Sequence, residues 1–92
     1  MKNIAWNDKK NRELQAERGV CFEDVVTSLI NSKILDVINH PNKKQYPNQR
    51  IFILIINDYV HIVPFIEDEK TIFLKTIIPS RKMTKKYLTR GE

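Results

Sequence analysis

The sequence predicts an α+β protein in which two N-terminal helices pack on a twisted, mostly antiparallel sheet of about four strands, followed by a short basic helix. Two observations predict this fold class. An apolar stripe with helical spacing begins at Phe22, and a run of apolar residues fills positions 51–56. The length of 92 residues suits one domain over residues 1–92, and a hydrophobic content of 41% suffices for a small core.

The first third of the chain predicts a short strand followed by two helices. Residues 4–6 form the strand, and Asn7 is a favourable N-cap for a polar helix over residues 8–18, which Gly19 ends. The second helix is the clearest in the chain, because its apolar residues share one face: Phe22, Val25, Val26, Leu29 and Ile30. Cys21 precedes it and is interpreted as a small half-buried hydrophobe, since no adjacent cation would activate its thiol.

The middle of the chain predicts the first strands of an antiparallel meander. A strand over residues 33–38 leads into a polar loop over residues 40–49 that contains two prolines. The strand over residues 50–56 is almost entirely apolar, so we expect it in the middle of the sheet with both faces buried. The dipeptide Asn57-Asp58 then favours a tight hairpin turn.

The rest of the chain predicts two further strands and the terminal helix. The strand over residues 59–66 contains Pro64, where we expect a bulge or a locally unpaired edge because proline cannot donate to a ladder. An acidic turn leads to a last strand over residues 71–78. Pro79 ends that strand, and Ser80 caps the final helix.

Composition excludes several classes of protein. No stretch of about 18 apolar residues is present, which excludes a transmembrane helix. The first eight residues become polar too soon for a signal peptide. The single cysteine cannot form an internal disulfide, which favours a reducing compartment. We therefore expect a small cytoplasmic protein with no membrane partner.

The net charge of +5 is unevenly distributed. Residues 1–38 are neutral, residues 39–66 carry +2, and residues 67–92 carry +3. The last block contains six basic residues with no acidic residue among them: Lys75, Arg81, Lys82, Lys85, Lys86 and Arg90. Such a cluster is typical of a protein that binds a polyanion, although a solvated C-terminal helix has the same composition.

Metal and cofactor chemistry are poorly supported. His40 and His61 lie on different elements without a Cys or His partner at ligand spacing, and two isolated glycines cannot form a phosphate-binding loop. We therefore predict neither a metal nor a cofactor. RNA offers a route that needs neither, because its own 2′-hydroxyl can attack the adjacent phosphate in line. The protein must then orient the backbone, stabilise the added negative charge and move protons.

The cations near the last strand and helix are candidates for binding the phosphate. Arg81 and Lys82 fall at the start of the final helix, where backbone amides also favour anions, although a plain solvated helix start is equally compatible. Lys75 is expected to share a strand face with Phe73 and Ile77, which is an unusual position for a charge unless it snorkels or serves a site.

Two residues are candidates for proton transfer. His61 lies on the strand beside the candidate cations, and a hydrogen-bonded core histidine is the more common explanation for such a position. Tyr87 lies on the final helix, where its ring more often packs against a sheet than transfers protons.

Two segments of the chain resemble the BrnT toxin family. The first resembles the family's tryptophan-centred strand, Lys-Asn helix and Gly-Val-x-Phe-Glu-Asp helix start: Trp6-Asn7-Asp8-x-Lys10-Asn11 and Gly19-Val20-x-Phe22-Glu23-Asp24. The second resembles the family's basic residue, two isoleucines, Ser-Ala-Arg and basic helix with a tyrosine: Lys75-Thr76-Ile77-Ile78-Pro79-Ser80-Arg81 and the helix through Tyr87. Here Pro79 and Ser80 replace the family's Ser-Ala, and Lys75 stands where arginine is usual.

The resemblance implies a RelE-like fold and a ribonuclease toxin of a bacterial type II toxin–antitoxin system. Such toxins cleave RNA without a metal and inhibit translation. Their partner is a cognate antitoxin, usually with a ribbon-helix-helix DNA-binding domain and BrnA-like, so operator DNA is contacted only through the antitoxin. Arg81, Lys75 and Arg50 occupy the positions that match basic residues of the family.

The chemistry of the residues and the family resemblance together define the predicted site. The catalytic candidates are Arg81, Lys75, His61 and Tyr87. The RNA-binding candidates are Arg50, Ser80, Lys82, Lys85 and Lys86. The alternative hypothesis is a non-catalytic basic module that binds nucleic acid or an acidic protein partner.

Overall fold

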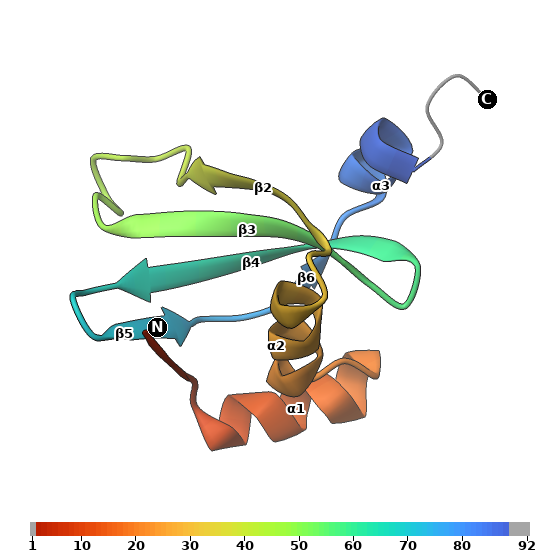
Figure 1. Ribbon diagram of the computed structural model, residues 1–92, viewed down its shortest axis with the longest axis horizontal. Coiled ribbons are helices and arrows are strands. Elements are labelled where there is room, and N and C mark those ends of the chain that lie inside the picture. The colour runs from red at the N-terminus through yellow and green to blue at the C-terminus, as the bar shows by residue number, and fades with distance from the viewer. Residues whose placement is uncertain (1, 89–92) are drawn as a thin grey trace.

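A computed structural model describes residues 2–88 of the chain (Figure 1). Within this range the elements are, in order, β1 (Asn3–Ala5), α1 (Asp8–Arg18), α2 (Phe22–Ile30), β2 (Ile34–Asn39), β3 (Gln49–Ile56), β4 (Tyr59–Glu67), β5 (Thr71–Leu74), β6 (Ile78–Pro79) and α3 (Arg81–Leu88). The predicted α+β class is confirmed. No helix among these residues is long and apolar enough to cross a membrane.

The sheet contains more strands than the four that were predicted. Its order is β1-β5-β4-β3-β2, with the short β6 pairing beside β4, so residues 2–88 contribute six strands. All pairings are antiparallel except the one between β1 and β5, where Ile4 lies opposite Ile72. The count is higher because β1 joins the sheet and because the last predicted strand is divided into β5 and β6.

Pro64 explains where that last strand divides. The Pro64 carbonyl accepts a 2.8 Å hydrogen bond from the amide of Lys75, so this residue presents its backbone to the side of β4 that β5 and β6 occupy. Its nitrogen points the same way and carries no hydrogen to donate. β5 pairs with β4 up to Leu74 opposite Phe65, and β6 resumes at Ile78 opposite Ile62. Of the predicted bulge or locally unpaired edge at Pro64, the second is found in part, because Pro64 accepts one bond on this side and donates none, and the neighbouring strand is interrupted beside it.

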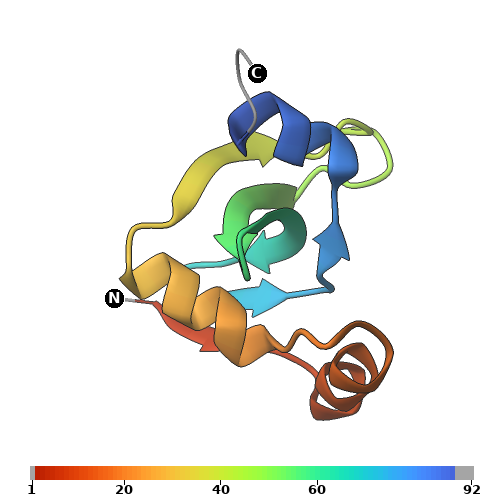
Figure 2. The same ribbon diagram turned by 90° about the vertical axis from the view of Figure 1, so that its right-hand side faces the viewer.

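The two N-terminal helices cover one face of the sheet. Leu14, Val20, Phe22 and Val25 are buried and pack against alternate residues of the strands: Phe52, Leu54, Ile56, Val63, Phe65 and Leu74. In Figure 2 the strands lie between α1 and α2 at the bottom and α3 at the top. Ile30, at the end of the apolar stripe, is 73% exposed because α2 ends there.

Several boundaries of the helices and of the hairpin turn agree with the local signals that predicted them. The Asn7 side chain accepts a 2.9 Å hydrogen bond from the amide of Lys10 at the start of α1. Gly19 ends that helix in the left-handed conformation, with φ 68°. Asn57 and Asp58 both have positive φ, at 53° and 61°, which is the backbone of a type I′ hairpin turn.

Candidate nucleic-acid interface

The start of α3 is fixed to β4 by hydrogen bonds of Ser80 and Thr84. The amide of Ser80 donates to the Val60 carbonyl at 2.9 Å, and the amide of Val60 donates to the Thr84 hydroxyl at 2.9 Å. The Thr84 hydroxyl in turn donates to the Ser80 carbonyl at 2.8 Å. The Ser80 hydroxyl accepts from the amide of Met83 at 3.2 Å, which is the N-cap that the sequence predicted.

This anchored helix presents its cations to solvent. Arg81, Lys82, Lys85 and Lys86 are all exposed, and the first turn holds no acidic residue. Arg81 and Lys82 therefore stand at the positive end of the helix dipole, where a cation is unfavourable by about 0.3–1 kcal/mol. A bound anion would relieve this repulsion and would also accept from those amides of the first turn that the Ser80 cap does not use. The sixth cation of the predicted cluster, Arg90, lies outside the described residues.

Lys75 lies in the break between β5 and β6 and is exposed. Its ammonium nitrogen is 5.7 Å from the centroid of the Phe73 ring, so the predicted shared face of these two side chains is confirmed. The other predicted neighbour, Ile77, is fully buried in the helix-covered core. The prediction failed for Ile77 because the strand alternation stops at the break.

Tyr87 lies on α3 among these cations. Its side chain is half-buried, and the ammonium nitrogen of Lys86 is 5.4 Å from the centroid of its ring. The phenol thus lies within the basic helix that was predicted to carry it.

His61 lies inside the protein, unlike the cations of α3. It is only 5% exposed and lies on the helix-covered face of β4, opposite Leu54 of β3. Its Nδ1 is 2.9 Å from the carbonyl oxygen of Tyr59, which can only accept, so Nδ1 carries the hydrogen. Burial lowers the pKa of this imidazole, while the bond to Tyr59 and the charge of Asp24 raise it more weakly. At neutral pH the ring is therefore uncharged, and it is directed away from the surface of α3.

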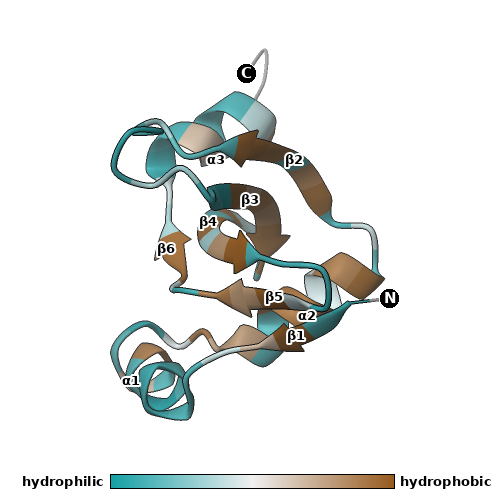
Figure 3. Ribbon diagram, turned by 90° about the vertical axis from the view of Figure 1, so that its left-hand side faces the viewer, coloured by the Kyte–Doolittle hydropathy of each residue, from teal (hydrophilic) through white to brown (hydrophobic). Residues whose placement is uncertain are grey.

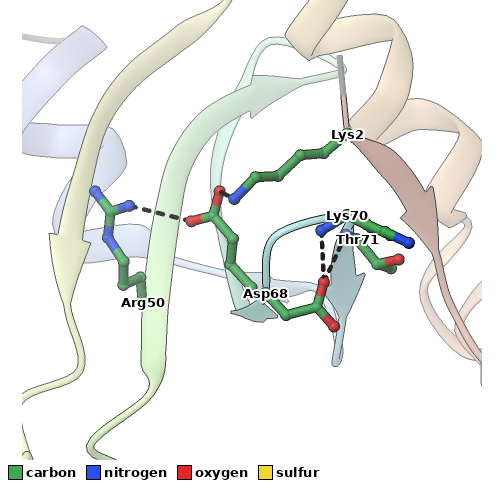
Figure 4. A network of polar contacts seen from close by, with 6 residues as sticks. Lys2, Arg50, Asp68, Lys70 and Thr71 are labelled. Carbon is green, nitrogen blue, oxygen red and sulfur yellow. Dashed lines mark hydrogen bonds and ion pairs between the residues drawn. The ribbon is translucent and has the colours of Figure 1, made fainter.

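Arg50 is the second residue of β3, and the start of β3 lies at the opposite end of the sheet from α3 (Figure 1). Its guanidinium is 3.4 Å from a carboxylate oxygen of Glu67 and 5.9 Å from the centroid of the Phe65 ring. The second oxygen of Glu67 accepts a 2.7 Å hydrogen bond from Lys2, and these cations flank the carboxylate in Figure 4. Arg50 is thus partly neutralised and does not join the cluster on α3.

The acidic turn has a structural role that the sequence analysis missed. Glu67, in the strand end, joins β1 and β3 through Lys2 and Arg50. Asp68 accepts hydrogen bonds from the amides of Lys70 and Thr71 at 2.8 and 2.7 Å (Figure 4). Both carboxylates have a lowered pKa, Glu67 through its bond to Lys2 and Asp68 through these amides. The carboxylates of Glu67 and Asp68 therefore hold the strand end and the turn in place.

A partly exposed apolar surface lies on the sheet face that α1 and α2 leave uncovered. We call it the open sheet face, and its residues are Ile62, Pro64, Ile66, Phe73 and Ile78. Ile66 and Ile78 are each 37% exposed. Lys75 lies beside Phe73 on this surface, and α3 follows directly from Ile78 and Pro79. Lys75 thus lies on the open sheet face, and the basic helix α3 begins where β6 of that face ends.

The loop between β2 and β3 is the second feature that the sequence analysis missed. The rings of His40 and Tyr46 contact each other across it, with centroids 4.5 Å apart and planes inclined by 42°. Viewed along the sheet, the loop lies on the side where α3 lies, and both are coloured hydrophilic in Figure 3. The sequence did indicate that this loop and its flanking strands are basic, because residues 37–57 contain three basic residues and no acidic one.

Other possible sites do not include the predicted residues. A pocket of about 190 Å³ between α2 and the end of β3 is lined by none of them. Across residues 2–88, no three His, Cys, Asp or Glu side chains converge in a way that could hold a metal ion. Comparison of the chain with protein-family models, with curated proteins and with solved structures gives no match.

Proposed function

We propose that this protein is a metal-independent endoribonuclease that acts as the toxin of a type II toxin–antitoxin pair and inhibits translation by cleaving RNA. A RelE-like, BrnT-type toxin is the specific form of this proposal. The observation that carries it is the set of exposed cations on a helix held rigidly to β4, with Arg81 and Lys82 at the helix N-terminus.

In this proposal the start of α3 binds the scissile phosphate. Arg81 and Lys75 neutralise the charge that develops as the 2′-hydroxyl attacks, and the amides of the first turn add further donors. Preorganisation favours this role, because Ser80 and Thr84 fix the helix start to the backbone of Val60 before any ligand binds. Lys82, Lys85 and Lys86 orient the flanking RNA through their exposed charges.

The proton-transfer role is best assigned to Tyr87. It is half-buried on the same helix as the phosphate-binding cations, whereas His61 is buried and uncharged on the other face of the sheet. A buried neutral imidazole cannot reach an RNA backbone at the surface, so His61 acts in this proposal by supporting β4 next to the anchor of α3.

An acidic partner protein completes the proposal. The cations of α3 and Lys75 border an apolar surface, and a partner with acidic and apolar side chains would cover both. We propose that this partner is the cognate antitoxin and that its binding blocks access of RNA.

A non-catalytic binding module is the second candidate. The burial of His61 favours it, because the His61 imidazole is then not available beside the cations of α3. The same surface would bind nucleic acid or an acidic protein, and RNA would remain intact.

Expression in bacteria from an inducible promoter tests the proposal. The wild-type protein should arrest growth, and Arg81→Ala should not, because it removes the principal phosphate-binding charge. Arg12→Ala is the matched control, since Arg12 is an exposed arginine on α1. Equal toxicity of the Arg81→Ala and wild-type proteins would remove Arg81 from the site.

Incubation of the purified protein with RNA separates the two candidate functions. We expect cleavage with and without a chelator, and protection when the antitoxin is added. RNA that stays intact under all conditions would favour the binding module. Cleavage that the chelator abolishes would contradict the metal-independent mechanism.

A further inference from the structure

The loop between β2 and β3 is ordered by its own hydrogen bonds. The side-chain oxygen of Asn42 accepts from the amide of Gln45 at 3.2 Å, and its carbonyl accepts from the amide of Tyr46 at 2.9 Å. The amide of Asn42 itself donates to Nδ1 of His40 at 3.0 Å. These bonds hold His40 and Tyr46 in ring contact, although both rings remain partly exposed.

The chemistry of this loop suits a nucleic-acid strand. The ring pair offers an aromatic surface on which a base can stack, and every base has such a face, so stacking tolerates any sequence. Lys43 and Lys44 are exposed between the two rings in the chain, where they can contact phosphates. Because Nδ1 of His40 accepts from a backbone amide, its neutral ring carries the hydrogen on Nε2, which is a further donor.

The loop between β2 and β3 lies on the same side of the sheet as α3. The loop lies at one end of the long strands and α3 at the other (Figure 1), and both lie on the same side of the sheet when it is viewed along its length (Figures 2 and 3). No acidic residue occurs between Asp36 and Asp58, so nothing within this segment repels a phosphate. A strand bound at α3 could therefore continue towards the loop.

We propose that residues 40–48, which we call the aromatic loop, form a second binding site for single-stranded RNA, in which Tyr46 and His40 stack on a base and Lys43 and Lys44 bind the adjacent phosphates. This inference rests on the proposed function, since it takes RNA as the ligand. It adds an anchoring site at a distance from the phosphate-binding start of α3, and such a site holds the substrate without touching the scissile bond.

Binding of a fluorescent 2′-O-methyl oligoribonucleotide, followed by anisotropy at low salt, tests the inference. This probe lacks the 2′-hydroxyl nucleophile, so cleavage does not disturb the measurement. Tyr46→Ala should weaken the affinity about 5- to 150-fold, the range that loss of one base–aromatic stack gives. Tyr46→Phe keeps the ring and should bind as the wild type does.

The charge contribution is tested by the double variant Lys43→Gln/Lys44→Gln. It should weaken binding and lower the slope of log affinity against log salt concentration by about 0.7 for each phosphate contact that is lost. Lys9→Gln, which removes an exposed lysine of α1, should change neither quantity. Thermal unfolding of each variant verifies that the fold is retained. The Tyr46 variants keep the hydrogen bonds that order the loop, because these bonds do not use the phenol of Tyr46.

The outcomes distinguish this inference from the proposed function. If Tyr46→Ala binds the probe as tightly as the wild type, the aromatic loop is not an RNA site, even where the protein cleaves RNA. If the wild type binds the probe through Tyr46 but leaves unmodified RNA intact, the aromatic loop is an RNA site and the nuclease proposal is wrong. A wild-type protein that does not bind the probe overturns the RNA site at the aromatic loop, and the cleavage of unmodified RNA then tests the nuclease proposal separately.

Discussion

Both backbone groups of Val60 bond to the start of α3, and the Thr84 hydroxyl accepts from the Val60 amide at 2.9 Å. Val60 is fully buried, so an amide left without this acceptor would lack a partner. Thr84→Val keeps the side-chain volume and removes the acceptor, and should lower the free energy of unfolding by about 1–3 kcal/mol. Thr84→Ser keeps the hydroxyl and should lose much less. Urea unfolding measures both, and equal stabilities of the two variants would contradict this role.

The ion pairs of Glu67 predict a dependence of stability on acid pH. The bond to Lys2 lowers the pKa of this carboxylate below its ordinary value of 4.5, with a smaller contribution from Arg50. A lowered pKa means that the stabilisation is present above pH 4.5 and is lost as the pH falls through the pKa of the folded state. Glu67→Gln should therefore lose less stability than the wild type between pH 7 and pH 3.

The matched control for this change is Glu69→Gln, which removes an exposed carboxylate from the same turn. The urea midpoint of each protein at the two pH values provides the measurement. A pH dependence for Glu67→Gln that equals that of Glu69→Gln would show that the contacts of Glu67 do not stabilise the fold.

His61 should titrate below its ordinary pKa of 6.5, because burial disfavours the charged ring. Since the unfolded chain takes up this proton at a higher pH, stability should fall as the pH drops below about 6.5. Nitrogen-15 NMR of the imidazole gives a direct test. The folded protein should have the hydrogen on Nδ1, bonded to the Tyr59 carbonyl, and an unprotonated Nε2. A titration midpoint above 6.5, or the opposite tautomer, would be incompatible with this environment.

Gly19 should be needed for its backbone conformation alone. Its φ is 68°, and a Cβ built at this position would have no atom within 4 Å. Gly19→Ala should therefore cost only the strain of the left-handed region, about 1–2 kcal/mol, without a steric clash. Gly19→Asn should cost less, because asparagine tolerates this region better. Thermal or urea unfolding of the two variants tests the order, and equal losses would contradict the conformational explanation.

Features that depend on neighbouring residues could be predicted from the sequence. The cap at Asn7, the left-handed Gly19 and the hairpin turn at Asn57 and Asp58 each depend on a few adjacent positions. The exposed cations at the start of α3 were predicted for the same reason, since Ser80 marks the cap and Arg81 follows it.

Features that depend on distant residues were missed. The break at Lys75 follows from the missing N–H of Pro64 on the neighbouring strand, so the irregularity lies in a segment whose own residues give no signal. The contact between His40 and Tyr46 depends on the loop conformation that Asn42 stabilises, which spacing alone does not specify. The bond of Glu67 to Lys2 likewise joins residues that are 65 positions apart in the sequence.

The parallel pairing of β1 with β5 places a constraint on the order of events during translation. Asn3 emerges from the ribosome well before its partner Thr71, which follows only after α1, α2 and β2 to β4 have been made. At a synthesis rate of about 5–20 residues per second, β1 waits several seconds for a strand to join. The helices can form in that interval, because their contacts are local, whereas β1 can pair only after β5 has emerged. An antibody or peptide that captures the nascent N-terminal strand should therefore compete with folding only until β5 has emerged.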